Sequence, residues 1–263
     1  MDGSTDALAA VRRSGQVYFA QIAEQTSLSC GVALTCARYP GYHNGNQLRE
    51  AILPSGRSAG ECFDEAQAFY AQQGLRCFRW VPAAVQPIEP LEAFLAGRGY
   101  VTARNLAMKW TQEAAITVNP RVKLLPARAM RSALRQVILS NSVHPPEVRA
   151  MLADVTVERL DDPSYDVYVA LLDGRPAGYG GLLQAGDIGR IENIFVAETC
   201  RRQGVGRTLI AHLLALSKRL ALRITCLETT EGNAAARALY ERCGLEAGGM
   251  YVEFLAPEVQ PGP

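Results

Sequence analysis

The chain has 263 residues, of which 48% are hydrophobic, and its 27 basic and 26 acidic side chains leave a formal net charge of +1. This length allows one or two domains with substantial cores. The even charge balance excludes a general attraction to nucleic acid or to an anionic membrane, so we expect neither as a partner.

Cysteine usage and the N-terminal sequence indicate the compartment. The seven cysteines form no C-x-x-C motif, and the three histidines are not spaced as metal ligands, so we expect reduced thiols and no metal site. Residues 1–6 lack the basic and apolar regions of a signal peptide, and no apolar run reaches the roughly 18 residues that span a bilayer. The sequence therefore predicts a cytoplasmic protein.

In chain order, the first half contains a helix pattern that opens at residues 57–62 and continues to Gly74. A strand-like segment follows at residues 75–81. Residues 91–97 then lead into an alternating segment at residues 100–110.

The second half begins with two predicted helices, residues 127–140 and 145–153. Three alternating segments separated by turns, residues 167–172, 177–183 and 188–196, predict consecutive antiparallel strands. A helix at 205–220, a strand at 222–228 and a short helix at 233–243 follow, with Asn233 as N-cap and Gly244 as terminator. Residues 245–255 alternate again and predict one or two closing strands.

The loop between the strand ending at Val196 and the helix beginning at Val205 is basic and punctuated by glycine. A helix N-terminus presents unpaired N–H groups and the positive end of its dipole, which suits phosphate oxygens. Gly204 allows a positive φ, and Gly206 removes a side chain that would stand between the first-turn amides and an anion. Positive charge is added by Arg201, Arg202 and Arg207.

These residues resemble the pyrophosphate loop, R/Q-x-x-G-x-G/A, of the GNAT superfamily of acetyl-CoA-dependent N-acetyltransferases. Further along, the chain resembles the second signature of that superfamily, N-x-x-A-x-x-L-Y-x-x-x-G-F, with Leu245 in place of the usual phenylalanine. The positions that match this second signature are Asn233, Ala236, Leu239, Tyr240 and Gly244. The resemblance covers roughly residues 123–255.

The resemblance implies acetyl-CoA as co-substrate and no metal. Backbone groups of Ile194, Phe195 and Val196 would pair with the pantetheine arm, and an N–H near Val196 would polarise the acetyl carbonyl. The pyrophosphate would be held at Arg201, Arg202, Gln203, Gly204, Val205, Gly206, Arg207 and Thr208. Asn233, Ala236 and Tyr240 complete the cofactor residues, although Asn233 is equally explained as a helix cap.

Tyr240 is the expected general acid, because its hydroxyl can donate a proton to the departing thiolate. The alternative is a core aromatic at helical spacing. Glu192 is the expected general base, on the same side of its strand as Ile194 and Val196, where apolar neighbours would raise its pKa. A structural carboxylate held by backbone or arginine donors is the alternative, with a water chain acting as base. Cys200 has no motif-linked histidine, so we expect direct transfer.

The first half resembles a decayed copy of the second, as in tandem members of the superfamily. Aligning Gly99 with Gly244 puts Leu95 where Tyr240 stands and Glu61 where Val205 stands, and Cys62 replaces the final loop glycine. Glu61, Asp64 and Glu65 would also put negative charge where the phosphate would sit, which argues against acetyl-CoA binding in this half. The alternative is that the two halves are not a repeat, because any alternating series of strands and helices shows the same order of elements.

We therefore predict an α/β (α+β) protein with two GNAT-like domains, each a mixed, mostly antiparallel twisted sheet flanked by helices. A degenerate, non-catalytic domain covers residues 1–119, a catalytic domain covers 120–257, and residues 258–263 form a frayed tail. The two domains would be joined near Asn119 and Pro120.

The predicted reaction is transfer of acetyl from acetyl-CoA to a primary amine of a small molecule, by a monomer or homodimer. Two alternatives remain open. One is acetylation of protein N-termini or lysines, and the other is a non-catalytic acyl-CoA sensor.

Overall fold

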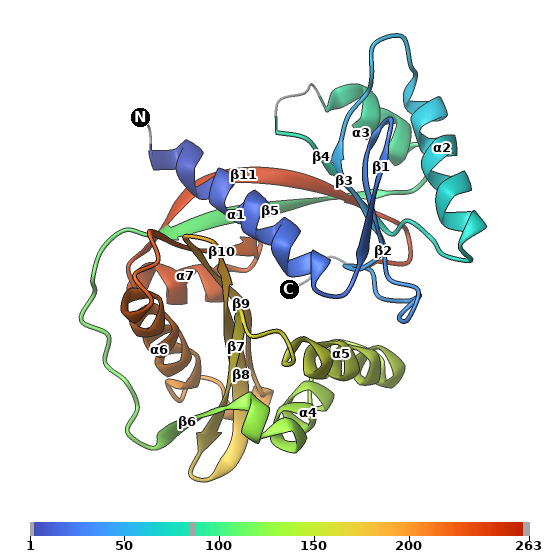
Figure 1. Cartoon of the computed structure of the whole chain (residues 1–263). Helices are drawn as coiled ribbons and strands as arrows, with labels where there is room; N and C mark the ends of the chain where they lie inside the picture. The colour runs from blue at the N-terminus through green and yellow to red at the C-terminus, as the bar shows by residue number, and fades with distance from the viewer. Residues whose placement is uncertain (1–2, 85–87, 260–263) are drawn as a thin grey trace. The chain divides into compact units, whose positions relative to one another are not determined.

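The computed structural model describes residues 3–84 and 88–259 of the chain (Figure 1). These residues form two compact units, and each unit is discontinuous in sequence. Unit 1 contains residues 3–18, 106–229 and 233–249, and unit 2 contains residues 19–84, 88–105, 230–232 and 250–259.

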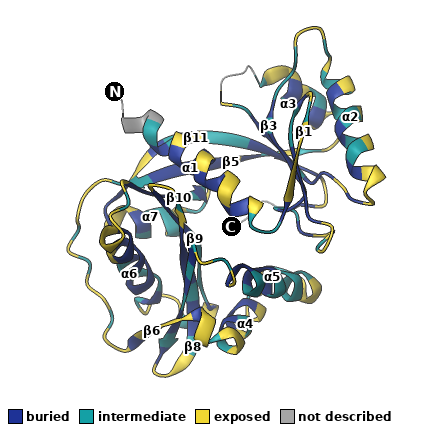
Figure 2. Cartoon of the chain, viewed as in Figure 1, coloured by how far each residue is buried: buried dark blue, intermediate teal, exposed yellow. Residues whose placement is uncertain are grey.

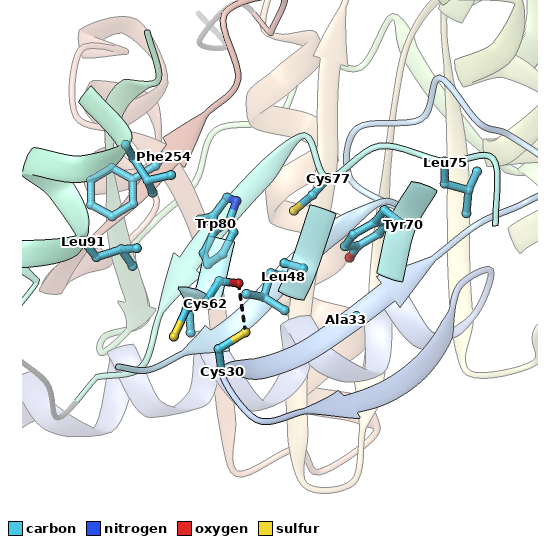
Figure 3. Close-up of a cluster of buried hydrophobic side chains, with 13 residues drawn as sticks. Cys30, Ala33, Leu48, Cys62, Tyr70, Leu75, Cys77, Trp80, Leu91 and Phe254 are labelled. Atoms are coloured by element: carbon cyan, nitrogen blue, oxygen red, sulfur yellow. Dashed lines mark hydrogen bonds between the residues drawn. The ribbon is translucent and has the colours of Figure 1, made fainter. Parts of the chain in front are cut away.

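Unit 2 is built on the strand order β1, β2, β3, β4, β11. The first three strands pair antiparallel, β3 and β4 pair parallel across the α2 connection, and the end of β11 pairs antiparallel with β4. Its elements are β1 (Glu24–Leu28), β2 (Gly31–Thr35), β3 (Gln47–Ala51), α2 (Ala59–Gln72), β4 (Arg79–Pro82), α3 (Glu89–Ala96) and the ends of β5 (Val101–Trp110) and β11 (Leu245–Leu255). The core packs Leu48, Trp80 and Phe254 against Tyr70 and Cys62 of α2 (Figure 3).

Unit 1 carries the strand order β11, β5, β10, β9, β8, β7, β6. Strands β6 to β9 pair antiparallel, whereas β9 and β10 pair parallel. Helices α6 and α7 cover one face of this sheet, and α1, α4 and α5 cover the other (Figure 1). The further elements of unit 1 are α1 (Gly3–Ala20, which ends in unit 2), β6 (Val122–Pro126), a 3-10 turn (Ala127–Ala129), α4 (Arg131–Leu139), α5 (Pro146–Arg159), β7 (Tyr165–Leu172), β8 (Arg175–Ala185), β9 (Ile188–Val196), a 3-10 turn (Glu198–Cys200), α6 (Val205–Arg219), β10 (Ile224–Thr230) and α7 (Ala234–Arg242).

Burial follows these layers. Residues that face the sheets are buried, while the outer sides of the helices are exposed (Figure 2). Of the five apolar residues predicted to share one face of helix α6, Val205, Leu209, Leu213 and Leu216 are buried, whereas Leu220, just beyond the end of α6, is 41% exposed. The predicted α/β class with mixed, mostly antiparallel sheets is therefore confirmed.

Several elements lay outside the sequence prediction. Helix α1, strands β1 to β3 and strand β6 were not predicted, and α5 continues six residues beyond the predicted end at residue 153, to Arg159. Helix α1 mixes apolar and polar residues, and its apolar residues Ala7, Ala10, Val11 and Tyr18 are buried by tertiary packing. None of the described helices combines the length and apolar character needed to cross a membrane.

The two halves of the chain repeat one arrangement of elements. The series β3, α2, β4, α3, β5 has the same order as β9, α6, β10, α7, β11, and in both the first two strands are parallel. Both first strands also contain an irregularity with a non-glycine residue at positive φ, which is Glu50 at 49° in β3 and Asn193 at 57° in β9. The helix that opens at Ser58 corresponds to the helix that opens at Gly204, so Ala59, rather than Glu61, stands where Val205 stands.

The closing strands of the two repeats are exchanged. In unit 1, β10 is adjacent to β5, and in unit 2, β4 pairs with β11. The compact units therefore do not coincide with the predicted domains 1–119 and 120–257, because each long closing strand is divided between units and α1 belongs mainly to unit 1.

The predicted tail is ordered where it is described. Val259 is 3% exposed in an apolar cluster with Phe78 and Leu255, and Glu258 forms an ion pair with Arg76 at 2.8 Å. The prediction of a frayed end is wrong for these two residues, since their contacts hold them in place. The rest of that segment, residues 260–263, lies outside the described residues.

Candidate functional site

The loop after β9 leaves the N-terminus of α6 open. Gly204 is the N-cap residue at φ 77°, as the sequence predicts, and among the residues that the structure describes no side chain caps this helix. Arg202 also has a positive φ of 61°. The first-turn N–H groups of α6 therefore have no intrahelical acceptor, and they are left for an external one.

The equivalent helix in unit 2 is closed. Ser58 and Glu61 form a capping box at the start of α2, in which the Glu61 carboxylate accepts from the Ser58 N–H at 2.8 Å. These hydrogen bonds from Ser58 hold the pKa of Glu61 below its ordinary value. A carboxylate of the chain thus stands at the N-terminus of α2, where an external anion would have to bind.

Asn119 braces the open loop. Its Nδ2 donates to the Gln203 carbonyl at 2.8 Å, and its backbone N–H donates to Thr208 Oγ1 at 3.1 Å. Thr208 Oγ1 in turn donates to the Gly204 carbonyl at 3.0 Å. Asn119 was predicted to lie in a linker between domains, and this is wrong, because it lies within the continuous segment 106–229 of unit 1 and contacts the loop. No motif in the sequence marks that contact.

Arg207 and Gly206 also shape the start of α6. The Arg207 Nη2 lies 3.8 Å from where a Cβ at Gly204 would stand, and Arg207 Nε has no hydrogen-bond partner within residues 3–84 and 88–259. A Cβ on Gly206 would lie 3.2 Å from Leu239 and 3.5 Å from Val196. Gly206 thus allows the close approach of α6 and α7, and its predicted clearance for an anion stays a prediction.

The remaining arginines and glutamine of the loop are exposed. Arg201 Nε donates back to the Val196 carbonyl at 3.4 Å, and Gln203 Nε2 donates to the Thr199 carbonyl at 3.1 Å. The Val205 side chain is buried in the core beneath the loop, so only its backbone is available to a ligand.

Strands β9 and β10 separate just before this loop. Their parallel pairing covers Ile188 to Arg190 of β9, whereas β9 stays paired with β8 as far as Val196. Over the described part of the chain, the β9 edge that carries Ile194, Phe195 and Val196 is thus not paired with β10. An open strand edge of this kind can pair with an extended ligand.

A bulge at Asn193 changes which side chains share a face. Glu192 is opposite Gly181 and Phe195 is opposite Tyr179, so two residues of β9, at positions 193 and 194, stand opposite one residue of β8, at position 180. Glu192 therefore shares a face with Phe195 and not, as predicted, with Ile194 and Val196. The latter two pack on the α6 face, in the cluster that contains Leu209.

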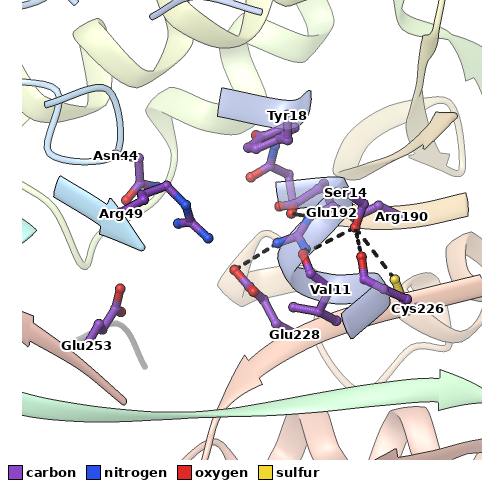
Figure 4. A network of polar contacts seen from close by, with 12 residues as sticks. Val11, Ser14, Tyr18, Asn44, Arg49, Arg190, Glu192, Cys226, Glu228 and Glu253 are labelled. Atoms are coloured by element: carbon purple, nitrogen blue, oxygen red, sulfur yellow. Dashed lines mark hydrogen bonds and ion pairs between the residues drawn. The ribbon is translucent and has the colours of Figure 1, made fainter. Parts of the chain in front are cut away.

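Glu192 belongs to a buried charge network (Figure 4). Arg190, which is 0% exposed, donates to Glu192 through Nε, pairs with Glu228 at 2.8 Å, and donates to the Val11 carbonyl of α1 at 2.8 Å. Burial raises the pKa of Glu192 in spite of the attraction of Arg190, and Glu228 adds to the rise. Arg190 is thus the arginine donor expected if Glu192 is a structural carboxylate. The buried surroundings of Glu192 also suit a general base.

Tyr240 lies on the other face of the sheet. Its ring is 7% exposed and packs with Ile191, Leu213 and Cys243. Burial raises the pKa of Tyr240 to about 12, and the negative charge of Glu192 adds to the rise. The two predicted catalytic side chains are therefore on opposite faces but within electrostatic range of each other, where β9 and β10 part.

Asn233 acts as the predicted cap. Its side chain accepts from the Ala236 N–H at 3.0 Å, and Ala236 packs against the core of unit 1. Among the residues that the structure describes, no three His, Cys, Asp or Glu side chains are grouped where they could hold a metal ion.

The separation of β9 from β10 and the open N-terminus of α6 together form a candidate site for an extended ligand that carries phosphate groups. Residues 133–245 match the model of the acetyltransferase (GNAT) family. This part of the chain belongs to that family, which confirms the resemblance seen in the loop and in the second signature.

A curated relative from Bacillus subtilis (strain 168), described as a ribosomal protein bS18-alanine N-acetyltransferase, is 33% identical over 93 residues. Those residues make up 35% of this chain and 62% of the relative, so the chain spans less than two thirds of the relative's length.

Solved structures resemble a larger part of the chain. A conserved protein of unknown function from Staphylococcus epidermidis has a TM-score of 0.72 at 15% identity and covers 90% of this chain and 95% of its own. A GCN5-related N-acetyltransferase from Kribbella flavida has a TM-score of 0.64 at 15% identity and covers 96% of both chains. A tandem GNAT protein from the clavulanic acid biosynthesis pathway has a TM-score of 0.53 at 18% identity and covers 79% of this chain and 74% of its own. At these identities the likeness establishes the fold, and the last structure agrees with a tandem arrangement.

Proposed function

We propose that the chain is an acetyl-CoA-dependent N-acetyltransferase that transfers acetyl directly to a primary amine of a small molecule. The observation that carries this proposal is the N-terminus of α6, which no described side chain caps, after a strand, β9, that has separated from β10. The matching helix α2 is closed by its own glutamate. We propose on the same ground that only the second half binds acetyl-CoA.

The residues of unit 1 have separate tasks in this reaction. The first-turn amides of α6 and the Arg207 guanidinium hold the pyrophosphate, and the β9 edge from Ile194 to Val196 pairs with the pantetheine arm. A β9 amide near Val196 polarises the acetyl carbonyl. The amine nitrogen forms the new C–N bond as the C–S bond breaks. Glu192 accepts the proton of the amine through a water, and Tyr240 donates its proton to the thiolate.

Comparison of two ligands tests the phosphate site. Full-length protein should bind coenzyme A at least about a hundredfold more tightly than pantetheine, because two or more charge-assisted hydrogen bonds to the pyrophosphate are lost. Isothermal titration calorimetry measures both affinities. Equal affinities, or no binding of coenzyme A, would refute the proposal.

Protein N-termini are the second candidate acceptor, because the Bacillus subtilis relative is described as acting on an alanine of a ribosomal protein. Release of free thiol distinguishes the candidates when small amines, lysine peptides and peptides with N-terminal alanine are assayed side by side. Tight coenzyme A binding with no turnover on any acceptor would support the sensor alternative instead.

Glu192→Gln tests the base. A general base must be ionised to act, so activity falls as the pH drops through its pKa, and the raised pKa of Glu192 puts this limb above the ordinary range of a carboxyl. We expect the variant to be slower and to lose that limb of the profile of kcat against pH. Two acceptors with different amine pKa values serve as a control, since a limb that belongs to the amine moves with the acceptor. A retained, acceptor-independent limb would assign the base elsewhere.

We also propose a compartment and an assembly state for the protein. All seven cysteines are free, which suits a reducing cytoplasm. We propose a monomer or homodimer without nucleic-acid or membrane partners, in keeping with the net charge of +1.

A further inference from the structure

The bulge of β9 depends on an unusual backbone conformation. Asn193 has a φ of 57°, and asparagine reaches this left-handed region more readily than most residues with side chains. The extra residue sits where β9 leaves β10 and just before the proposed pantetheine edge. Whatever fixes Asn193 therefore also fixes the direction of the backbone groups that follow it.

Two tyrosine hydroxyls fix the Asn193 side chain. Its Nδ2 donates to the hydroxyl oxygen of Tyr18 at 2.8 Å and to that of Tyr165 at 3.0 Å. Tyr18 comes from α1, and Tyr165 is the first residue of β7. Both rings are buried, and they meet edge to face with centroids 5.7 Å apart. We call Asn193, Tyr18 and Tyr165 the bulge clamp.

The bulge clamp is itself held from two sides. The Arg159 guanidinium lies 3.6 Å from the centre of the Tyr18 ring and donates to the Tyr18 carbonyl at 2.8 Å. On β8, Gly181 leaves room for the Tyr165 ring, since a Cβ there would lie 2.6 Å from its edge. The Arg190 hydrogen bond to Val11 ties α1 to β9 at a second point. These contacts leave the two hydroxyls little freedom to move.

We propose that the bulge clamp positions the cofactor edge of β9, so that α1, at the opposite end of the sequence from the GNAT motifs, takes part in acetyl-CoA binding. This rests on the proposed function. An edge that is already bent before the ligand arrives loses less conformational freedom on binding. The apolar packing of Ile194 and Val196 keeps the strand in register, and the bulge clamp sets the orientation of the peptide groups between Asn193 and Val196.

Asn193→Gly isolates the side chain, because glycine keeps the positive φ and removes both hydrogen bonds. We expect coenzyme A to bind about tenfold more weakly, as follows from the loss of two neutral hydrogen bonds. Tyr18→Phe and Tyr165→Phe each remove a single oxygen and should weaken binding about threefold. Neither should add a further loss in the Asn193→Gly background, since the partner is already gone.

Two matched controls separate this role from general destabilisation. Ala221→Gly also replaces a residue at positive φ, 53°, but in the exposed turn that follows α6. Tyr168→Phe removes another hydroxyl of β7. Both should keep the wild-type affinity in calorimetry on the full chain, with melting temperatures recorded in parallel.

The outcomes are distinct. Wild-type coenzyme A affinity in Asn193→Gly and in Tyr165→Phe, even with a lowered melting temperature, would reduce the bulge clamp to a structural feature and overturn the inference. Failure of the wild-type protein to bind coenzyme A would instead refute the proposed function, and this role with it.

Discussion

Gly204→Glu is expected to weaken acetyl-CoA binding by at least about a hundredfold, because it puts a carboxylate at the start of α6, where the pyrophosphate is proposed to sit. A Cβ at this position would meet the Asn119 Cβ at 3.3 Å, so the new side chain also presses on the residue that braces the loop. Binding of coenzyme A measured by calorimetry gives the result directly.

Gly174→Glu is the matched control for this substitution. Gly174 has a φ of 80°, close to the 77° of Gly204, and nothing lies within 4 Å of where its Cβ would stand. Both variants therefore introduce a similar backbone strain, of about 1 kcal/mol, and both add one negative charge. Similar losses of affinity in the two would trace the effect to stability or net charge and would remove the α6 terminus as the phosphate site.

The loop and the fold class could be predicted from the sequence because both are local in origin. The positive φ at Gly204 and the start of α6 at Val205 follow from glycine's freedom at a strand-to-helix turn and from the apolar spacing that begins there. The strand Ile188–Val196 likewise has its predicted bounds.

The supporting contacts could not be predicted, because they join residues that are distant in the chain. Asn119 and Gln203, or Tyr18 and Asn193, share no motif or period, and only the folded topology brings them together. The face of β9 on which Glu192 lies could not be predicted either, because it depends on the bulge at Asn193. Strict alternation placed Glu192 with Ile194, and one extra residue at positive φ turned it to the opposite face.

The first half shows where a sequence alignment of repeats fails by a small shift. The order of elements was predicted, but pairing Glu61 with Val205 missed that α2 begins at Ala59. Glu61 is instead the third residue of its helix, where its carboxylate accepts hydrogen bonds from the backbone N–H and the hydroxyl of Ser58. Glu61, one of the acidic residues that argued against phosphate binding, is thus one half of a capping box, which explains its position.

Tyr240→Phe is expected to lower kcat by about two to four orders of magnitude and to leave coenzyme A affinity near the wild-type value. The substitution removes only the hydroxyl, so the packing of the ring with Ile191 and Leu213 is retained. Single-turnover rates with saturating acetyl-CoA, together with calorimetry, separate the two effects. The matched control is Tyr168→Phe, a tyrosine of the same unit on β7.

The pKa of Tyr240 decides whether it can act as an acid. At about 12 it stays protonated throughout the neutral range, so it always has a proton to give, but to a thiolate in water, with a pKa near 8.5, the transfer would be uphill. A thiolate expelled next to Tyr240 would be shielded from water, as the Tyr240 side chain is. Burial raises the pKa of Cys243, a thiol in the same cluster, and it would make the leaving thiolate a stronger base for the same reason. The pKa of the acid and the pKa of the leaving thiol would therefore be raised together, which keeps the proton transfer feasible. Turnover of Tyr240→Phe within about twofold of wild type would show that the thiolate takes its proton elsewhere and that Tyr240 serves the core alone.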